Sequence, residues 1–173
     1  MSKQFSLTDG LSMRPARDSD KPFIAMLHHS TRDDLRLIDG ENDFIEALIE
    51  QQHYAQTVGY GEAYPNAMYF IVEKQSERIG RIIVNFGHTE IHLIDLALIP
   101  QARGLGYGKG IIQALQYAAS AANAPLTLAV NHINFQAKAL YLKLGFQTRE
   151  LTAMYEYMIW YPNAVEMNKI TLI

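Results

Sequence analysis

The sequence predicts an α/β domain of mixed type, in which helices flank a central sheet that is largely antiparallel. Three observations support this fold class. Apolar residues at helical spacing come early in the chain, strand-like runs joined by polar turns follow, and strand and helix patterns then alternate. A length of 173 residues suits one such domain with a substantial core, and no repeat or linker indicates a second one. We therefore expect residues 1–173 to form a single domain.

The first third of the chain predicts a tail, one strand and two helices. In order, these are a loose tail at 1–10, a strand at Leu11–Arg17, a helix that starts at Asp18–Pro22, and a helix from Glu41 to near Tyr54. Proline is tolerated in the first helical turn, so Pro22 marks a helix start. The second helix is expected to end before Gly59, Gly61 and Pro65, because glycine and proline interrupt helical patterns.

Strands dominate the middle of the chain, and strands and helices alternate after it. The expected strands are, in order, Ala67–Glu73, Ile79–Phe86, Glu90–Leu98, Leu126–Val130, Phe146–Leu151 and Ala153–Tyr161. The polar segment Lys74–Arg78 predicts a tight hairpin turn between the first two. Helical spacing follows Gly110 and recurs over 134–144. The C-terminal tail at 162–173 fits neither pattern; it could pair with a second subunit in a homodimer or cover the sheet.

Composition indicates an ordinary soluble globular protein, with 49% hydrophobic residues and 19% charged residues. The chain has no cysteine, which excludes disulfides and thiolate chemistry. Its N-terminal segment lacks the apolar core of a signal peptide, and no apolar run reaches the roughly 20 residues that span a bilayer. We expect a cytoplasmic protein with no membrane partner. A net charge of −3 and the lack of a Lys/Arg cluster also argue against nucleic acid as a partner.

A glycine-rich run, Q-A-R-G-L-G-Y-G-K-G at 101–110, lies between a predicted strand and a predicted helix. Glycines let backbone N–H groups approach an anion, and the free amides of a helix's first turn add a positive end. Arg103 and Lys109 can add full positive charges, so the turn predicts a phosphorylated ligand. The spacing fits neither the dinucleotide fingerprint nor the phosphate loop of ATPases. What remains is Q-x-x-G-x-G, formed by Gln101, Gly104 and Gly106 and extended by Gly108.

A second motif, N-x-x-A-x-x-L-Y-x-x-x-G-F, runs from Asn134 to Phe146 without a gap. Its apolar positions have helical spacing, and Gly145 lies where a helix terminator is expected. Together, the two motifs resemble the acetyl-coenzyme A motifs of the GNAT superfamily of N-acetyltransferases, of the uncharacterised bacterial type. The resemblance covers about residues 68–160. It implies a GNAT-like fold whose central parallel strands splay apart to hold the pantetheine arm of acetyl-CoA.

The resemblance also implies where the cofactor binds. The diphosphate is expected on the turn, the pantetheine arm on the strand edge before it, and the pantetheine amide on the Asn134 side chain. The expected cofactor-binding residues are Leu96, Leu98, Ile99, Arg103, Gly104, Leu105, Gly106, Tyr107, Gly108, Lys109, Asn134 and Tyr141. Within this set, the backbone N–H of Leu98 is expected to polarise the thioester carbonyl and to stabilise the oxyanion that forms on it.

Tyr141 occupies the GNAT tyrosine position and is expected to be the general acid that protonates the leaving thiolate. Periodicity alone favours a tyrosine that only packs one helix face, and the complete motif around it reverses that preference. For the base that deprotonates the amine, the candidate is His92, with Glu90 and Asp95 as rivals. Asp95 lies in an apolar strand, and it could hold a substrate ammonium or bond to the backbone. Water could also deprotonate the amine.

The leading interpretation is an enzyme, an acyltransferase that moves an acetyl group from acetyl-CoA to a primary amine of a small molecule or peptide. The amine would attack directly in a ternary complex, and no metal is expected. The alternative is a catalytically degenerate CoA-binding or sensory module of the same fold. A transferase that acts on charged tRNA is a third class, which the acidic balance of the chain disfavours.

Overall fold

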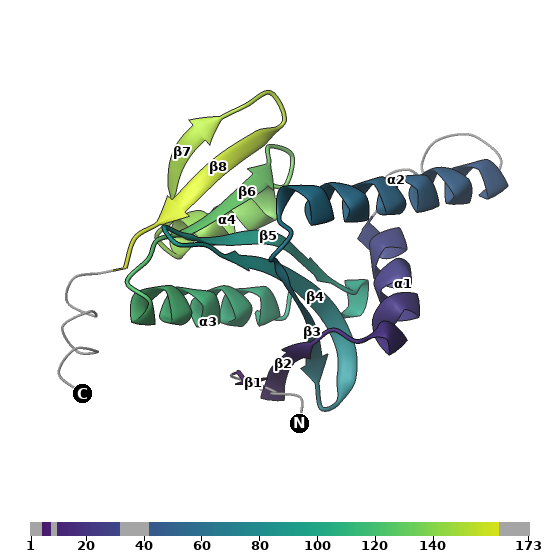
Figure 1. Cartoon of the computed structure of the whole chain (residues 1–173), viewed down its shortest axis with the longest axis horizontal. Coiled ribbons are helices and arrows are strands. Elements are labelled where there is room, and N and C mark those ends of the chain that lie inside the picture. The colour runs from purple at the N-terminus through teal and green to yellow at the C-terminus, as the bar shows by residue number, and fades with distance from the viewer. Residues whose placement is uncertain (1–4, 8–9, 32–41, 163–173) are drawn as a thin grey trace. The chain divides into compact units, whose positions relative to one another are not determined.

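The computed structural model describes residues 5–7, 10–31 and 42–162, and Figure 1 shows the course of the chain through its helices and strands. The strands pair in the order β1-β2-β3-β4-β5-β6-β8-β7. The elements are β1 (Phe5–Ser6), β2 (Leu11–Pro15), the 3-10 turn η2 (Asp18–Asp20), α1 (Lys21–Thr31), α2 (Asn42–Ala63), β3 (Met68–Lys74), β4 (Glu77–Phe86), β5 (Ile91–Leu98), the 3-10 turn η4 (Pro100–Ala102), α3 (Tyr107–Ala121), β6 (Leu126–Asn131), α4 (Phe135–Lys143), β7 (Gln147–Leu151) and β8 (Tyr155–Trp160).

Two compact units make up the chain. The first comprises 1–83 and 95–107, and the second comprises 84–94 and 108–173, so that strands β4 and β5 each contribute residues to both. The predicted fold class is confirmed: helices flank a mixed sheet in which antiparallel pairs predominate.

In the first unit, β2 pairs antiparallel with β1 on one side and with β3 on the other. Helix α1 buries Phe23 and Leu27 against Ile71 of β3, and Ala97 and Ile99 pack against this cluster. Because side chains alternate along a strand, Asp95 lies on the same face of β5 as Ala97. This placement puts a carboxylate on the helix-covered face of the first unit.

In the second unit, β5 and β6 run parallel, and their pairing covers Ile91–Leu93 and Leu126–Leu128. On its other side, β6 pairs antiparallel with β8 along its whole length. Helix α3 buries a stripe at helical spacing, formed by Ile111, Ile112, Leu115 and Ala119. Strands β6 and β8 add the buried side chains of Leu126, Leu128 and Met158. This apolar layer is the core of the second unit.

Two expectations from the sequence are wrong in detail. The helix expected from Glu41 to near Tyr54 is α2, which ends only at Ala63, because single glycines such as Gly59 and Gly61 cost a helix about 1 kcal/mol each and do not stop it. Within the expected loose tail, Phe5–Ser6 form β1 and pair with β2. The tail from 163 onward lies outside the described residues.

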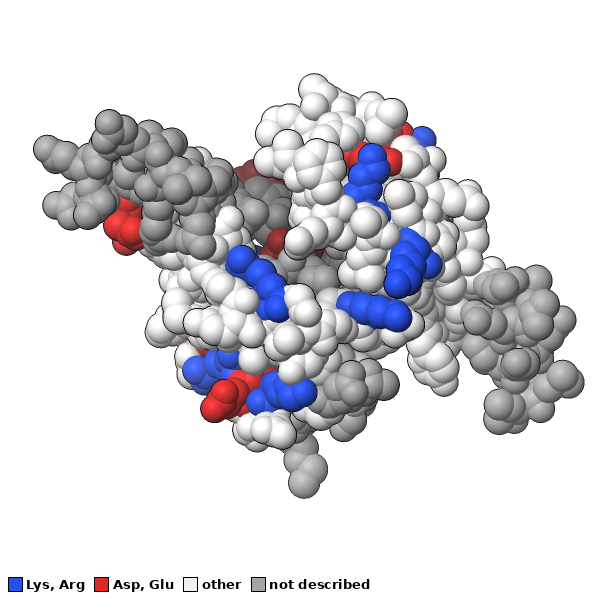
Figure 2. Space-filling model, turned by 180° about the vertical axis from the view of Figure 1, so that it is seen from behind, with Lys and Arg blue, Asp and Glu red and all other residues white. Residues whose placement is uncertain are grey.

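The described helices and surface can be compared with the expectation that neither a membrane nor a nucleic acid is a partner. Among the helices of the described part, none combines the length and the apolar character needed to cross a bilayer. On the face drawn in Figure 2, Lys and Arg side chains lie in several places, and some of them lie beside Asp or Glu side chains. The cytoplasmic location and the lack of a nucleic-acid partner stay predictions.

Candidate functional site

Within the glycine-rich run, Arg103–Gly106 form a turn before α3, and Tyr107–Gly110 already belong to the helix. Gly104 and Gly106 have φ angles of +72° and +85°, a backbone region that L side chains rarely adopt. A Cβ placed at either glycine would meet no atom within 4 Å, so the turn needs glycine for its backbone angles. The first turn of α3 carries no acidic side chain that would repel an anion. The turn therefore has the backbone and the electrostatics that a phosphate requires.

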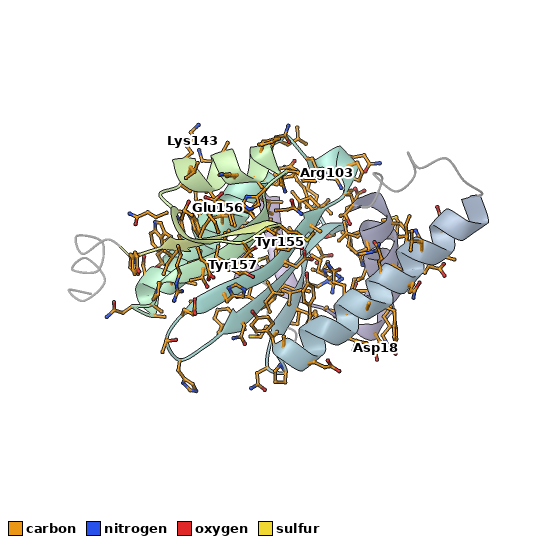
Figure 3. The ribbon with its side chains drawn as sticks, turned by 90° about the horizontal axis from the view of Figure 1, so that it is seen from above. Asp18, Arg103, Lys143, Tyr155, Glu156 and Tyr157 are labelled. Carbon is orange, nitrogen blue, oxygen red and sulfur yellow. The ribbon has the colours of Figure 1, made fainter. Side chains whose placement is uncertain are left out.

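Three side chains of the run have defined positions. Arg103 folds back toward the strand, and its Nε donates to the Leu98 carbonyl at 3.0 Å (Figure 3). The ring of Tyr107 lies under the ammonium of Lys74, 4.6 Å from the ring centroid. Lys109 is exposed on the first turn of α3. Arg103 and Lys109 thus bring positive charge to the turn.

At the end of β5, the backbone groups on one edge are directed toward β4, and those on the opposite edge are directed away from it. The N–H of Ile99 donates to the Ile79 carbonyl of β4 at 2.9 Å. Backbone N–H groups alternate in direction along a strand, so the N–H groups of Leu98 and Leu96 point away from β4. This is the orientation that an extended, amide-bearing arm would need for pairing along Leu96–Leu98.

Gly80 of β4 fits closely against this part of β5, and sequence reasoning missed it. A Cβ at Gly80 would lie 2.5 Å from the Ala97 carbonyl oxygen and 2.7 Å from a methyl carbon of Leu98. Such distances are too short for any side chain, so the two strands approach as they do only because position 80 is glycine. A glycine inside an otherwise apolar strand pattern was the available signal.

Helix α4 carries Asn134 and Tyr141 in the second unit. The Asn134 side chain caps the helix, because its Oδ1 accepts from the Ala137 N–H at 3.2 Å. Tyr141 lies seven residues on, nearly two full turns, and therefore on the same side of the helix. It is buried to 8% exposure, and its ring lies 5.6 Å from that of Phe146. At the other end, Gly145 has a φ of +96° and closes the helix, as its position in the motif predicts.

His92 of β5 lies beside Thr127 of β6, because the two residues are paired in the parallel register. The imidazole Nδ1 is 2.8 Å from the Thr127 hydroxyl oxygen. Burial lowers the pKa of His92, although the nearby Glu90 carboxylate acts in the opposite direction. A histidine that is neutral at pH 7 can accept a proton, which is the property its predicted role requires. The sequence carried no signal for Thr127.

Asp95, the rival of His92, forms an ion pair in the first unit. Its Oδ2 accepts from Nη2 of Arg81, a buried residue of β4, at 2.5 Å. The alternative that its carboxylate bonds to the backbone finds no counterpart among the described contacts of Asp95. Arg81 was not among the residues that the sequence indicated, because it lies in an apolar strand without a motif.

A buried carboxylate ties α4 to the strands of the second unit. Glu156 of β8 is 3% exposed, and its Oε2 lies 2.6 Å from the ammonium of Lys138 on α4. The Lys138 ammonium, together with a hydrogen bond that the Thr148 hydroxyl of β7 donates, lowers the pKa of Glu156. Tyr155 and Tyr157, the neighbours of Glu156, are exposed, as alternation along β8 requires (Figure 3). This network was also invisible to sequence reasoning.

No group of three His, Asp or Glu side chains gathers within the described ranges in the way that a metal ion would need. The expectation that no metal takes part stays a prediction.

Comparison with known proteins gives the class that this fold and turn define. Residues 24–146 match the model of the acetyltransferase (GNAT) family. The chain belongs to the GNAT acetyltransferase family.

Among curated proteins, an uncharacterised N-acetyltransferase of Methanocaldococcus jannaschii is 30% identical over 100 residues, which are 57% of this chain and 64% of that protein. The chain thus spans less than two thirds of that relative's length. Among solved structures, PaiA N-acetyltransferase from Thermoplasma acidophilum in complex with coenzyme A has a TM-score of 0.67 and 15% identity, and the match covers 87% of this chain and 98% of that one. RimL, a ribosomal L7/L12 α-N-protein acetyltransferase in complex with coenzyme A, has a TM-score of 0.66 and 13% identity, with 94% and 99% covered.

Proposed function

We propose that the protein is an acetyl-CoA-dependent N-acetyltransferase that acts on a primary amine of a small molecule or peptide. The observation that carries this proposal is the turn at 103–106, with two glycines in the left-handed region directly before α3. Family membership supports the same donor. The two similar structures named above contain coenzyme A, which is in keeping with a site for this carrier.

The turn and the strand edge are assigned to the carrier. Backbone N–H groups from Gly104 to Gly108 bind the diphosphate, because the N–H of Arg103 already donates to the Pro100 carbonyl at 3.2 Å. The Arg103 and Lys109 side chains add charge. The pantetheine arm pairs with the N–H groups of Leu96 and Leu98, on the edge where the Leu98 carbonyl accepts from Arg103. The amide nitrogen of Asn134 is available for it, because capping uses only the Oδ1 atom and Nδ2 has no partner among the described residues.

In the transfer step, the amine nitrogen attacks the thioester carbonyl carbon, and a C–N bond forms. The Leu98 N–H stabilises the negative charge on the carbonyl oxygen. The C–S bond then breaks, and the Tyr141 hydroxyl gives its proton to the thiolate. The nitrogen loses its proton to neutral His92 or to water. The products are an amide and the free thiol of coenzyme A.

The first experiment separates transfer from binding alone. Thermal stabilisation by acetyl-CoA is measured together with thiol release across a panel of primary amines. We expect both a higher melting temperature and acetyl-CoA-dependent thiol release with at least one class of amine. Stabilisation without release on any amine would instead identify a CoA-binding or sensory module. If acetyl-CoA neither raises the melting temperature nor releases thiol with any amine, the proposal as a whole is refuted.

A matched pair of variants tests the turn itself. Gly106→Val should abolish the affinity for acetyl-CoA, because a side chain at φ +85° forces the turn out of the conformation that presents its N–H groups. The control is Gly10→Val, since Gly10 has a φ of +71° and equally open space around it. It carries the same backbone penalty away from the turn and should retain affinity. Equal affinities for the two variants would remove the turn from the cofactor site.

A further inference from the structure

Arg81 is a buried arginine whose hydrogen-bonding capacity is only partly used. The residue is 6% exposed, and its Nη2 donates to Asp95. Its Nε is buried and has no hydrogen-bond partner within the described part of the chain. A buried N–H without a partner is unfavourable, and a charged guanidinium makes it more so. A second acceptor is therefore missing beside Arg81.

Arg14 of β2, in the same unit, shows what a satisfied arginine at this burial looks like. It is also 6% exposed, and its Nη1 and Nη2 each donate to Asp20 at 2.8 Å. Its Nε donates to Glu73 at 3.0 Å. All three nitrogens of Arg14 thus donate to carboxylates, and they bind two of them, whereas Arg81 binds one carboxylate. A second carboxylate at Arg81 would complete the arrangement that Arg14 has.

Further polar groups of the first unit have unused hydrogen-bonding capacity, and two residues, Asp95 and His53, interact with Arg81. Asp95 is 21% exposed at its side chain, and among the described residues its Oδ1 has no partner. On α2, the Oε1 of Gln52 is also buried without a partner there. Its neighbour His53 lies close enough to Arg81 that, after burial, the positive charge of Arg81 further lowers the pKa of His53. Free donors and free acceptors are therefore both present.

We propose that Arg81 and Asp95 form an acceptor subsite for amines that carry a carboxylate, such as free amino acids. The N–H groups that Asp95 leaves unused on Arg81 bind the carboxylate of the acceptor. The free oxygen of Asp95 accepts from the ammonium before the amine is deprotonated. This inference rests on the proposed transferase function and narrows its substrate class. Arginine suits this task because its planar fork matches the geometry of a carboxylate.

The test uses the wild-type protein, so that it does not depend on a variant folding. Thiol release from acetyl-CoA is measured with matched acceptors: an amino acid, its carboxamide, the amine left after decarboxylation, and a dipeptide with the same first residue. We expect kcat/KM for the amino acid to exceed those of the other three by roughly 10- to 100-fold. Equal values, or a preference for the dipeptide, would overturn the inference and leave the transferase function intact.

A binding measurement distinguishes failure of the acceptor subsite from failure of the proposed transferase reaction. If no amine releases thiol, yet the amino acid raises the melting temperature and its carboxamide does not, the subsite stands and the proposed reaction falls. If the amino acid neither reacts nor stabilises the protein, the subsite is refuted as well.

Variants then assign the preference to Arg81. Arg81→Met should reduce the ratio between amino acid and carboxamide to near one, through a higher KM for the amino acid, with acetyl-CoA affinity unchanged. Arg81→Lys keeps the charge without the fork and should recover part of the ratio. The control is Arg149→Met, because Arg149 forms an exposed, long ion pair of 3.7 Å with Glu90. A full preference that persists in Arg81→Met would refute the assignment.

Discussion

Asp20→Asn is the substitution whose consequences the structure defines most closely. Asp20 is fully buried at the start of α1, where it accepts two hydrogen bonds from Arg14 at 2.8 Å each. It also accepts from the backbone N–H of Arg17 at 2.7 Å and lies 2.9 Å from Nε of Arg78. The hydrogen bonds from Arg14 are the main reason that the pKa of Asp20 falls from 3.8 to about 2. One carboxylate therefore joins β2, the start of α1 and β4.

The lowered pKa gives the size and the direction of the effect. Because the folded-state pKa of Asp20 is below its unfolded value, the stabilisation is complete above pH 4 and is lost as the pH falls toward 2. The difference between 3.8 and about 2 corresponds to about 2 kcal/mol of the free energy of unfolding. Asp20→Asn removes the charge and leaves Arg14 and Arg78 facing a neutral amide. We expect a loss of roughly 3 to 5 kcal/mol at pH 7.

The measurement is urea unfolding, followed by circular dichroism, at pH 7 and at pH 2. The gap between wild type and Asp20→Asn should narrow by about 2 kcal/mol at the lower pH, because Asp20 is then about half protonated in the folded wild type and almost fully protonated in the unfolded chain. Asp18→Asn is the control, since the Asp18 side chain is 99% exposed and only faces Lys21 at 3.6 Å (Figure 3). Equal losses for the two variants, or a gap that does not change with pH, would refute this reasoning.

Three further predictions concern the site. Tyr141→Phe should lower kcat more than acetyl-CoA affinity, because only the proton donor is removed. The control Tyr117→Phe, on the exposed face of α3, should change neither quantity. Unchanged turnover in Tyr141→Phe would exclude Tyr141 as the acid. The rise of kcat/KM with pH should have its midpoint below pH 6.5, because burial lowers the pKa of His92. His92→Gln should remove this rise. A pH profile identical to that of the wild type would identify water as the base. Gly80→Ala should cost roughly 1–3 kcal/mol in urea unfolding, because its Cβ would lie 2.5 Å from the backbone oxygen of Ala97; an unchanged midpoint would contradict the close approach of the strands.

Local patterns in the sequence were sufficient to predict the structural features that depend only on neighbouring residues. Strand-like runs bounded by polar turns predicted the strands, and Gly104 and Gly106 adopt the left-handed angles that the turn requires. Asn134 caps α4 and Gly145 closes it, because capping involves atoms within a few residues of each helix end. The end of α2 was misplaced, since a glycine weakens a helix by an amount that the surrounding structure can offset.

Contacts between distant residues were decided by tertiary structure alone. Arg81 meets Asp95 across two strands, His92 meets Thr127 through the parallel register, and Arg14 bonds to Glu73, 59 positions away. Periodicity shows which face of a strand is buried, but it does not show which strand lies alongside or in what register. The sequence by itself therefore determined the fold class and the glycine turn before α3. The charged pairs that would select an acceptor exist only because folding brings together side chains that no local pattern connects.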